Sequence, residues 1–142
     1  MKIKVAWIGK TKETAIQSLT DEYLNRIARY AEIEGLALKD EAAVLALARG
    51  ERGGKRGKDK RRDELVLLDS RGKQFSSEEL AAFLDREQVA ALPLLFAIGG
   101  SDGFSDEARR QAALNLSLGK MTLPHELARV VLLEQIYRAF TI

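Results

Sequence analysis

The alternation of apolar and polar residues predicts a repeating order of strands and helices in the first third of the chain. A β-type run over residues 3–8 stops at Gly9, and apolar residues then recur at three-and-four spacing over residues 16–30, which predicts a helix. A second strand is expected over residues 33–38. Asp40 is a suitable N-terminal cap for the short alanine-rich helix that follows it.

Two fully apolar runs, residues 65–68 and 92–98, are typical of strands buried on both faces of a parallel sheet. The first strand is expected to end at the turn-forming sequence of residues 69–72. Ser76 and Glu79 have the spacing of a capping box, which predicts the start of another helix. Four strands alternating with three helices therefore predict an α/β fold, with a mostly parallel sheet and helices on both faces.

The last part of the chain predicts a short helix over residues 105–114, a short strand over 114–118 and a long helix over 124–140. The long helix is apolar on more than one face, so we expect it in the centre of the core or against a partner subunit. Ligands of parallel sheets bind beyond the carboxyl ends of the strands. The glycine-rich residues 99–103 follow such an end, although glycines there are usually only turns.

Composition limits the possible classes of protein. A chain of 142 residues predicts one domain spanning residues 1–142, and 46% hydrophobic with 31% charged residues is a folded, globular balance. The absence of cysteine excludes disulfides and thiolate metal sites, and a single histidine, His125, excludes a multi-histidine metal site. With no apolar run long enough for a membrane span, we expect a cytoplasmic protein without metal or membrane partners.

The formal net charge of +2 is unevenly distributed. Residues 49–62 contain eight basic and two acidic residues, so this segment carries +6 and the rest of the chain −4. Its four glycines disfavour a helix or strand, which predicts a mobile basic loop. Two interpretations stay open: a contact with nucleic-acid phosphate through Lys55, Arg56, Arg61 and Arg62, or a solvated connection that aids solubility.

Three stretches together resemble one protein family. They are Phe-Ala-Ile-Gly-Gly-Ser-Asp-Gly-Phe at residues 96–104, Leu-Ser-Leu-Gly-Lys-Met-Thr-Leu-Pro-His at 116–125, and Arg-Val-Val-Leu-Leu-Glu-Gln-Ile-Tyr-Arg-Ala-Phe at 129–140. The chain is similar here to the RlmH family of SPOUT methyltransferases, which methylate N3 of a pseudouridine in the helix 69 region of 23S rRNA. The similarity is strong from residue 92 onward, fair over 1–9 and 65–72, and poor over 32–62.

The resemblance implies S-adenosylmethionine as the methyl donor, bound by a deep trefoil knot in the C-terminal third. Knots are rare exceptions among folds, and periodicity alone does not predict one. The implied donor pocket agrees with the carboxyl ends of the predicted strands. Carried over to this sequence, its residues are Leu68, Gly99, Leu118, Gly119, Lys120, Met121, Thr122 and Leu123.

The resemblance also implies a homodimer in which each site is completed by the partner, and large-subunit rRNA in the ribosome as the substrate. His125 is the candidate catalytic residue, because the first turn of a helix favours a neutral imidazole that accepts a proton. The preferred alternative is a hydrogen-bonded structural residue that orders its loop, because solvent can take the proton in place of a side chain. Arg129 and Arg138 are further candidates for RNA phosphate or the base edge.

The family continues beyond its last helix into a short tail with Tyr and His that closes over the target nucleotide, whereas the sequence printed here stops at Thr141 and Ile142. We therefore expect donor binding to be retained and leave catalysis open. The alternative function is a non-catalytic ribosome or RNA-binding factor that retains the fold.

Overall fold

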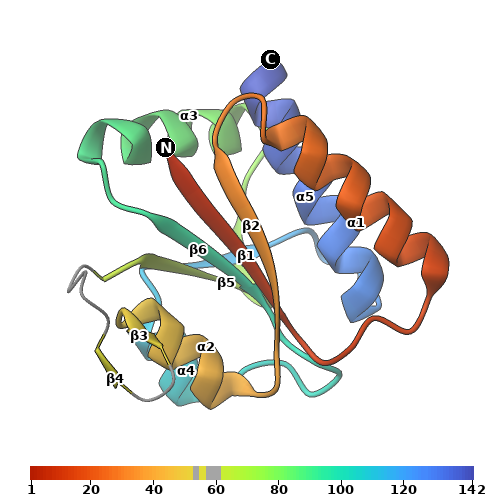
Figure 1. Ribbon diagram of the computed structural model, residues 1–142, viewed down its shortest axis with the longest axis vertical. Helices are drawn as coiled ribbons and strands as arrows, with labels where there is room; N and C mark the ends of the chain where they lie inside the picture. The colour runs from red at the N-terminus through yellow and green to blue at the C-terminus, as the bar shows by residue number, and fades with distance from the viewer. Residues whose placement is uncertain (53–54, 57–61) are drawn as a thin grey trace.

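A computed structural model describes the backbone of residues 1–52, 55–56 and 62–142 (Figure 1). Its centre is a sheet of five parallel strands in the order β2-β1-β6-β5-β7. The strands are β1 (Lys2–Ile8), β2 (Glu32–Leu38), β5 (Glu64–Gln74), β6 (Leu94–Ile98) and β7 (Leu114–Ser117). The predicted α/β class with a parallel sheet is confirmed, whereas the trefoil knot stays a prediction.

In the described part of the chain, five helices cover the two faces of this sheet (Figure 1). Those helices are α1 (Thr14–Ile27), α2 (Glu41–Ala48), α3 (Ser77–Ala90), α4 (Asp106–Gln111) and α5 (His125–Thr141). α1, α3 and α5 lie on one face, with α5 between the other two, and α2 and α4 lie on the opposite face. The prediction of helices on both faces is confirmed.

The alternation of side chains along each strand divides the core into two layers. Ile3, Val5 and Trp7 of β1 pack with α1 and α5, whereas Ala6 packs with α2 and α4. All five residues of β6 are buried, as expected for a central strand in a parallel sheet. Because parallel strands point the same way, the loops after β1, β5, β6 and β7 meet at one edge.

Helix starts follow the predicted capping residues. The Asp40 carboxylate accepts a hydrogen bond from the Ala43 N–H at 2.9 Å at the start of α2. At α3 the capping box is complete: Ser76 Oγ accepts from the Glu79 N–H, and Glu79 Oε1 accepts from the Ser76 N–H. The long final helix is also confirmed; it is central, and six of its residues are buried.

Two predictions about local structure are wrong. Residues 69–72 do not end β5; the strand continues to Gln74, and this four-residue bulge interrupts its ladder with β7, because Leu68 and Lys73 both pair with Leu116. Gly72 permits the bulge, since a Cβ there would lie 2.5 Å from the Asn115 carbonyl oxygen.

The basic segment also contains strands, which its glycines argued against. β3 (Glu51–Arg52) and β4 (Lys55–Arg56) form a short antiparallel pair. Residues 53–54 and 57–61 lie outside the described residues, so the predicted mobility of this segment is untested.

No helix in the described part of the chain has the length and apolar character needed to cross a bilayer.

Candidate active site

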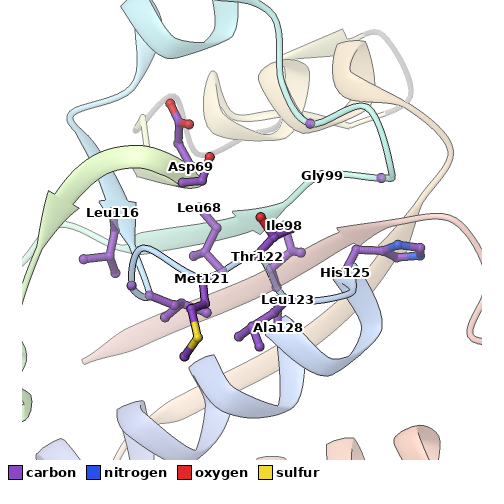
Figure 2. Close-up of a pocket in the computed structure, with 15 residues that line it drawn as sticks. Leu68, Asp69, Ile98, Gly99, Leu116, Met121, Thr122, Leu123, His125 and Ala128 are labelled. Carbon is purple, nitrogen blue, oxygen red and sulfur yellow. The ribbon is translucent and has the colours of Figure 1, made fainter.

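A pocket opens at the carboxyl edge of the sheet, beside β5, β6 and β7 (Figure 2). The empty space within it, which is continuous with solvent at the mouth, is about 600 Å³. The lining combines apolar side chains with the backbone of two glycine turns. The lining residues are Leu68, Asp69, Ser70, Ile98, Gly99, Gly100, Gly103, Leu116, Leu118, Gly119, Met121, Thr122, Leu123, His125 and Ala128.

The bulge in β5 places Asp69 and Ser70 at one wall of this pocket. The Asp69 carboxylate forms an ion pair with Arg109 of α4 at 2.8 Å and accepts a hydrogen bond from the Arg71 N–H. Both side chains of the ion pair are mostly buried, at 10% and 24% exposure. These contacts give the Asp69 carboxylate a defined position beside the pocket.

The turn after β6 forms a second wall. Gly99 is buried, and a Cβ there would lie 3.1 Å from the Gly103 carbonyl carbon, so only glycine fits the turn without displacing it. The Gly103 N–H donates to the Gly100 carbonyl at 3.0 Å, and Gly103 has a positive φ of 70°. Strand β6 therefore ends in a compact turn whose backbone faces the pocket.

The loop between β7 and α5 forms the third wall, and Ser117 fixes its start. Ser117 is 4% exposed; its Oγ donates to the Gly119 carbonyl at 2.9 Å and accepts from the Gly119 N–H at 3.1 Å. Beyond Gly119, Figure 2 shows Thr122 and Leu123 beside Leu68 and Ile98. This loop covers the apolar floor of the pocket.

Seven of the eight residues predicted for the donor pocket line this cavity, and their role in donor binding stays a prediction. They are Leu68, Gly99, Leu118, Gly119, Met121, Thr122 and Leu123. Lys120 is exposed and does not belong to the lining. The residues that sequence analysis missed include Asp69, Ile98, Leu116 and Ala128. For Asp69 and Ile98, adjacency to a predicted site residue was an available signal. Leu116 stands in the stretch 116–125 that carries the family resemblance, so it also had a signal, whereas Ala128 had none.

His125, the candidate catalytic residue, is exposed at the first position of α5. Its imidazole points away from Leu68, Leu123 and Met121 (Figure 2). The ring therefore lies at the mouth of the pocket, where it can meet a molecule that approaches from solvent. Its catalytic role stays a prediction.

Arg129 occupies a different place from the one predicted. Its side chain is 1% exposed, with the guanidinium carbon 4.0 Å from the Trp7 ring centroid and Nη1 donating to Thr11 Oγ1 at 2.8 Å. Burial lowers the pKa of the guanidinium, and the nearby Glu126 carboxylate opposes this shift. The predicted contact with RNA phosphate is wrong for this conformation, because the charge is enclosed by protein.

The other candidate RNA contacts are distributed over the surface. Arg138 is half exposed and donates to Glu134 at 3.0 Å; this hydrogen bond raises the pKa of Arg138. Arg62 is exposed. For Lys55 and Arg56 only the backbone is described, and Arg61 lies outside the described residues.

A family model described as "Predicted SPOUT methyltransferase" matches residues 1–142. Two curated relatives carry the name "Ribosomal RNA large subunit methyltransferase H". The protein from Koribacter versatilis is 56% identical over 143 residues, covering all of this chain and 93% of its own length. The protein from Geobacter sulfurreducens is 48% identical over 146 residues, covering all of this chain and 95% of its own length.

Solved structures with low sequence identity share the fold. The SpoU methyltransferase AviRb from Streptomyces viridochromogenes, crystallised with AdoMet, has a TM-score of 0.56 at 14% identity, covering 96% of this chain and 57% of its own. A probable methylase family protein from Haemophilus influenzae has a TM-score of 0.58 at 12% identity, and the match covers 98% of this chain and 66% of that protein.

Proposed function

The chain belongs to the SPOUT methyltransferase family, and we propose that it transfers a methyl group from S-adenosylmethionine to large-subunit ribosomal RNA. The observation that carries this proposal is the pocket at the carboxyl edge of the sheet, because its walls come from the glycine turn and the loop that bear the family resemblance. The names of the curated relatives support the RNA substrate.

The residues of the pocket fit S-adenosylmethionine. Leu68, Ile98 and Leu116 provide apolar surface for an adenine ring. Gly99 and Gly119 bring backbone amides and carbonyls into the lining, and these groups suit the polar edges of the adenosyl group. A Cβ at Gly99 would lie 3.1 Å from the Gly103 carbonyl carbon, a tight contact that favours glycine at this part of the lining.

When bound, S-adenosylmethionine supplies a methyl group activated by the positive charge of its sulfonium. The task of the protein is then to hold the acceptor nitrogen in line with the methyl carbon and to exclude water, and such alignment supplies much of the rate acceleration. Residues of the loop over 118–123 form one wall of the pocket. His125 lines the pocket, and its proposed part is to accept the proton lost by the acceptor nitrogen.

We propose N3 of a pseudouridine in the helix 69 region of 23S rRNA as the acceptor, supported by the three stretches of family resemblance. Ribosomes from a strain that lacks this methylation should take up label from S-adenosylmethionine, and mass spectrometry of digested RNA should place the label on pseudouridine. Label on another base or on small-subunit RNA would contradict this acceptor. Tight donor binding without transfer would instead support a non-catalytic RNA-binding factor.

The positive charge of residues 49–62 supports a role for this segment in RNA binding. Replacing Lys55, Arg56, Arg61 and Arg62 with alanine should flatten the log-log salt dependence of ribosome binding. The slope should fall by up to about 3, if each cation contributes roughly 0.7–0.9. An unchanged slope would support the solvated connection.

We further propose that the chain acts as a homodimer in the cytoplasm and that its C-terminal third is knotted. Leu19, Tyr30 and Leu127 are large apolar side chains that are at least 41% exposed on α1, the turn after it and α5, which supports a partner on this side. Sedimentation equilibrium should give twice the mass of the chain. A monomer at micromolar concentration would contradict the dimer.

A further inference from the structure

The connection between β1 and α1, residues 9–13, lies beside the donor pocket, and the proposed function leaves it without a role. It begins after Ile8, next to the pocket-lining Gly100, where an added Cβ would lie 4.0 Å from Ile8 Cγ2. Further along, the Lys12 N–H donates to Glu126 Oε1 at 2.6 Å. Figure 1 shows this β1–α1 connection passing the first turn of α5, the helix whose first residue lines the pocket.

Two lysines give the β1–α1 connection its positive charge. Lys10 and Lys12 are exposed, and neither forms an ion pair within the residues that the structure describes. The nearby Glu126 carboxylate binds the backbone N–H of Lys12. Each ammonium has three donors on a flexible stem, so both lysines can contact an anion that approaches from solvent.

The connection ends at the N-terminus of α1, which lacks a side-chain cap. Glu13 at the N-cap position forms no capping hydrogen bond, and the first turn contains no acidic residue. The first N–H groups of a helix carry partial positive charge and bind phosphate readily. The 14 residues of α1 are long enough to develop this dipole. The two lysines therefore stand next to the positive end of a helix.

A buried cation packs against the connection from the inside. Arg129 is 1% exposed, and its Nη1 donates to Thr11 Oγ1 at 2.8 Å and to Thr20 Oγ1 at 3.4 Å. Within the described residues its buried Nε has no hydrogen-bond partner, and no carboxylate lies within ion-pair distance of the guanidinium. A buried charge without a counter-ion is unfavourable. An anion on the outer side of the connection would offset this cost.

Thr11 is the point at which Arg129 fixes the connection. Its side chain is half-buried and accepts the hydrogen bond from Arg129, whereas Lys10 and Lys12 on either side are exposed. The arginine therefore holds the middle of the connection inward and leaves both lysines facing solvent.

We propose that the β1–α1 connection binds a backbone phosphate of the RNA next to the target nucleotide, through Lys10, Lys12 and the first N–H groups of α1. Arg129 does not touch this phosphate; it is a positioning residue that holds Thr11 and adds positive charge beneath the site. Phosphate contacts of this kind fix the position of an RNA without reading its sequence. The inference rests on the proposed function, because it assigns how the same substrate is held while its base enters the pocket.

The first test removes the two ammonium groups. Lys10→Ala/Lys12→Ala is compared with Lys2→Ala/Arg86→Ala, which removes two exposed charges toward the opposite edge of the sheet. For the first variant, the log-log salt slope of ribosome binding should fall by roughly 1.4–1.8 and the KM for ribosomes should rise about tenfold. The transfer rate at saturating ribosomes should not change, because the contact is equally strong before and during transfer. The dissociation constant for S-adenosylmethionine should also stay the same, and the control variant should match the wild type throughout.

The second test addresses Arg129 through its partner Thr11. Thr11→Val keeps the shape of the side chain but removes the acceptor for the Arg129 hydrogen bond, whereas Thr11→Ser keeps the acceptor. Thr11→Val should lose part of the salt slope and raise the KM for ribosomes about threefold, with unchanged donor binding. Thr11→Ser should bind ribosomes like the wild type. A purely structural role of the hydrogen bond would lower the free energy of unfolding and leave the salt slope unchanged.

A wild-type slope and KM for Lys10→Ala/Lys12→Ala would overturn the inference. An equal loss in the control variant would do the same, because it would indicate general charge attraction. Weaker binding of S-adenosylmethionine by the lysine variant would also overturn it, since the lysines would then bind the carboxylate of the donor. A wild-type slope for Thr11→Val would remove the positioning role of Arg129. All four results leave the proposed function intact, which fails only if the wild-type chain labels no ribosomal RNA.

Discussion

Ala128 and Arg129 are neighbours on α5, yet one lines an open pocket and the other is enclosed by protein at the same edge of the sheet. Ala128 lines the donor pocket beside β5, β6 and β7, where the space is open. Arg129 is buried beside β1, where its guanidinium packs on Trp7 and contacts Thr11. One side of the carboxyl edge is therefore hollow and the other is filled, although all the strands involved are parallel.

The difference shows that strand order alone does not locate the pocket. All parallel strands end at this edge, but β1 carries Trp7 beside its last residue, with the Arg129 guanidinium over the indole ring, whereas β6 is followed by a glycine turn. Side-chain volume at the strand ends decides where a ligand fits. The following predictions test each side separately.

Gly72→Ala, in the bulge of β5 on the hollow side, should have the largest effect on stability. The added Cβ would lie 2.5 Å from the Asn115 carbonyl oxygen, so β7 or the bulge has to move. We expect the free energy of unfolding to fall by about 2–3 kcal/mol, measured by denaturant unfolding. Gly100→Ala is the control, because its Cβ would meet only Ile8 at 4.0 Å. Equal stability of the two variants would show that the bulge can move to accept the added Cβ with no loss in the free energy of unfolding.

Arg129→Ala tests the filled side. The change removes the contact with Trp7 and a hydrogen bond and leaves a void, while it also removes the cost of burying a charge. We expect a net loss of about 2 kcal/mol in the free energy of unfolding. Arg129→Met retains most of the volume and should lose about half as much. A larger loss for Arg129→Met than for Arg129→Ala would contradict a role in filling space.

Ala128→Leu should fill part of the donor pocket on the hollow side with side-chain carbons. The pocket has room for the added carbons, so the free energy of unfolding should change by less than about 1 kcal/mol. Binding of S-adenosylmethionine, measured by calorimetry, should weaken about tenfold, because the leucine occupies donor space. Ala82→Leu on the exposed face of α3 should leave binding unchanged.

Ser76→Ala should have the smallest effect, since it removes one capping hydrogen bond at the start of α3. We expect the free energy of unfolding to fall by about 1 kcal/mol. Ser105→Ala removes the corresponding cap of α4, far shorter than α3, and serves for comparison. An unchanged free energy of unfolding for Ser76→Ala would mean that packing alone stabilises the first turn of α3.

The same capping box predicts a dependence on pH. The hydrogen bond from the Ser76 N–H lowers the pKa of Glu79 below its usual value of 4.5. Because the pKa of Glu79 is lower in the folded state than in the unfolded state, ionised Glu79 contributes to the free energy of unfolding. This contribution is complete above pH 4.5 and is lost as the pH falls through the pKa of the folded state. Glu79→Gln should therefore make the free energy of unfolding fall less steeply below pH 4.5. An unchanged pH dependence in this range would show that Glu79 makes no contribution.

The sequence pattern was sufficient for most elements of the fold. Strands β1, β2, β6 and β7, and the caps at Asp40 and Ser76, follow from local periodicity and local hydrogen bonding. The bulge at residues 69–72 could not be predicted, because a turn-forming sequence and a bulge have the same local preferences. The close approach of Gly72 to Asn115, which distinguishes them, is a long-range contact.

The site was predictable where it follows the ends of strands. Leu68, Gly99 and the loop at 118–123 were anticipated from the resemblance and from strand ends, and the structure brings most of them around one pocket. The exposed position predicted for Arg129 was wrong, since an arginine on a helix is usually exposed, and the contacts that explain its burial, with Trp7 and Thr11, are far away in sequence.

The order β2-β1-β6-β5-β7 also has a consequence for synthesis of the chain. Strand β1 leaves the ribosome well before its second neighbour, β6, which begins at Leu94, about 90 residues later. At roughly 5–20 residues per second, one side of β1 waits roughly 5–18 s for its backbone partners. During that interval its N–H and C=O groups form an open edge, which other nascent chains can pair with until β6 arrives.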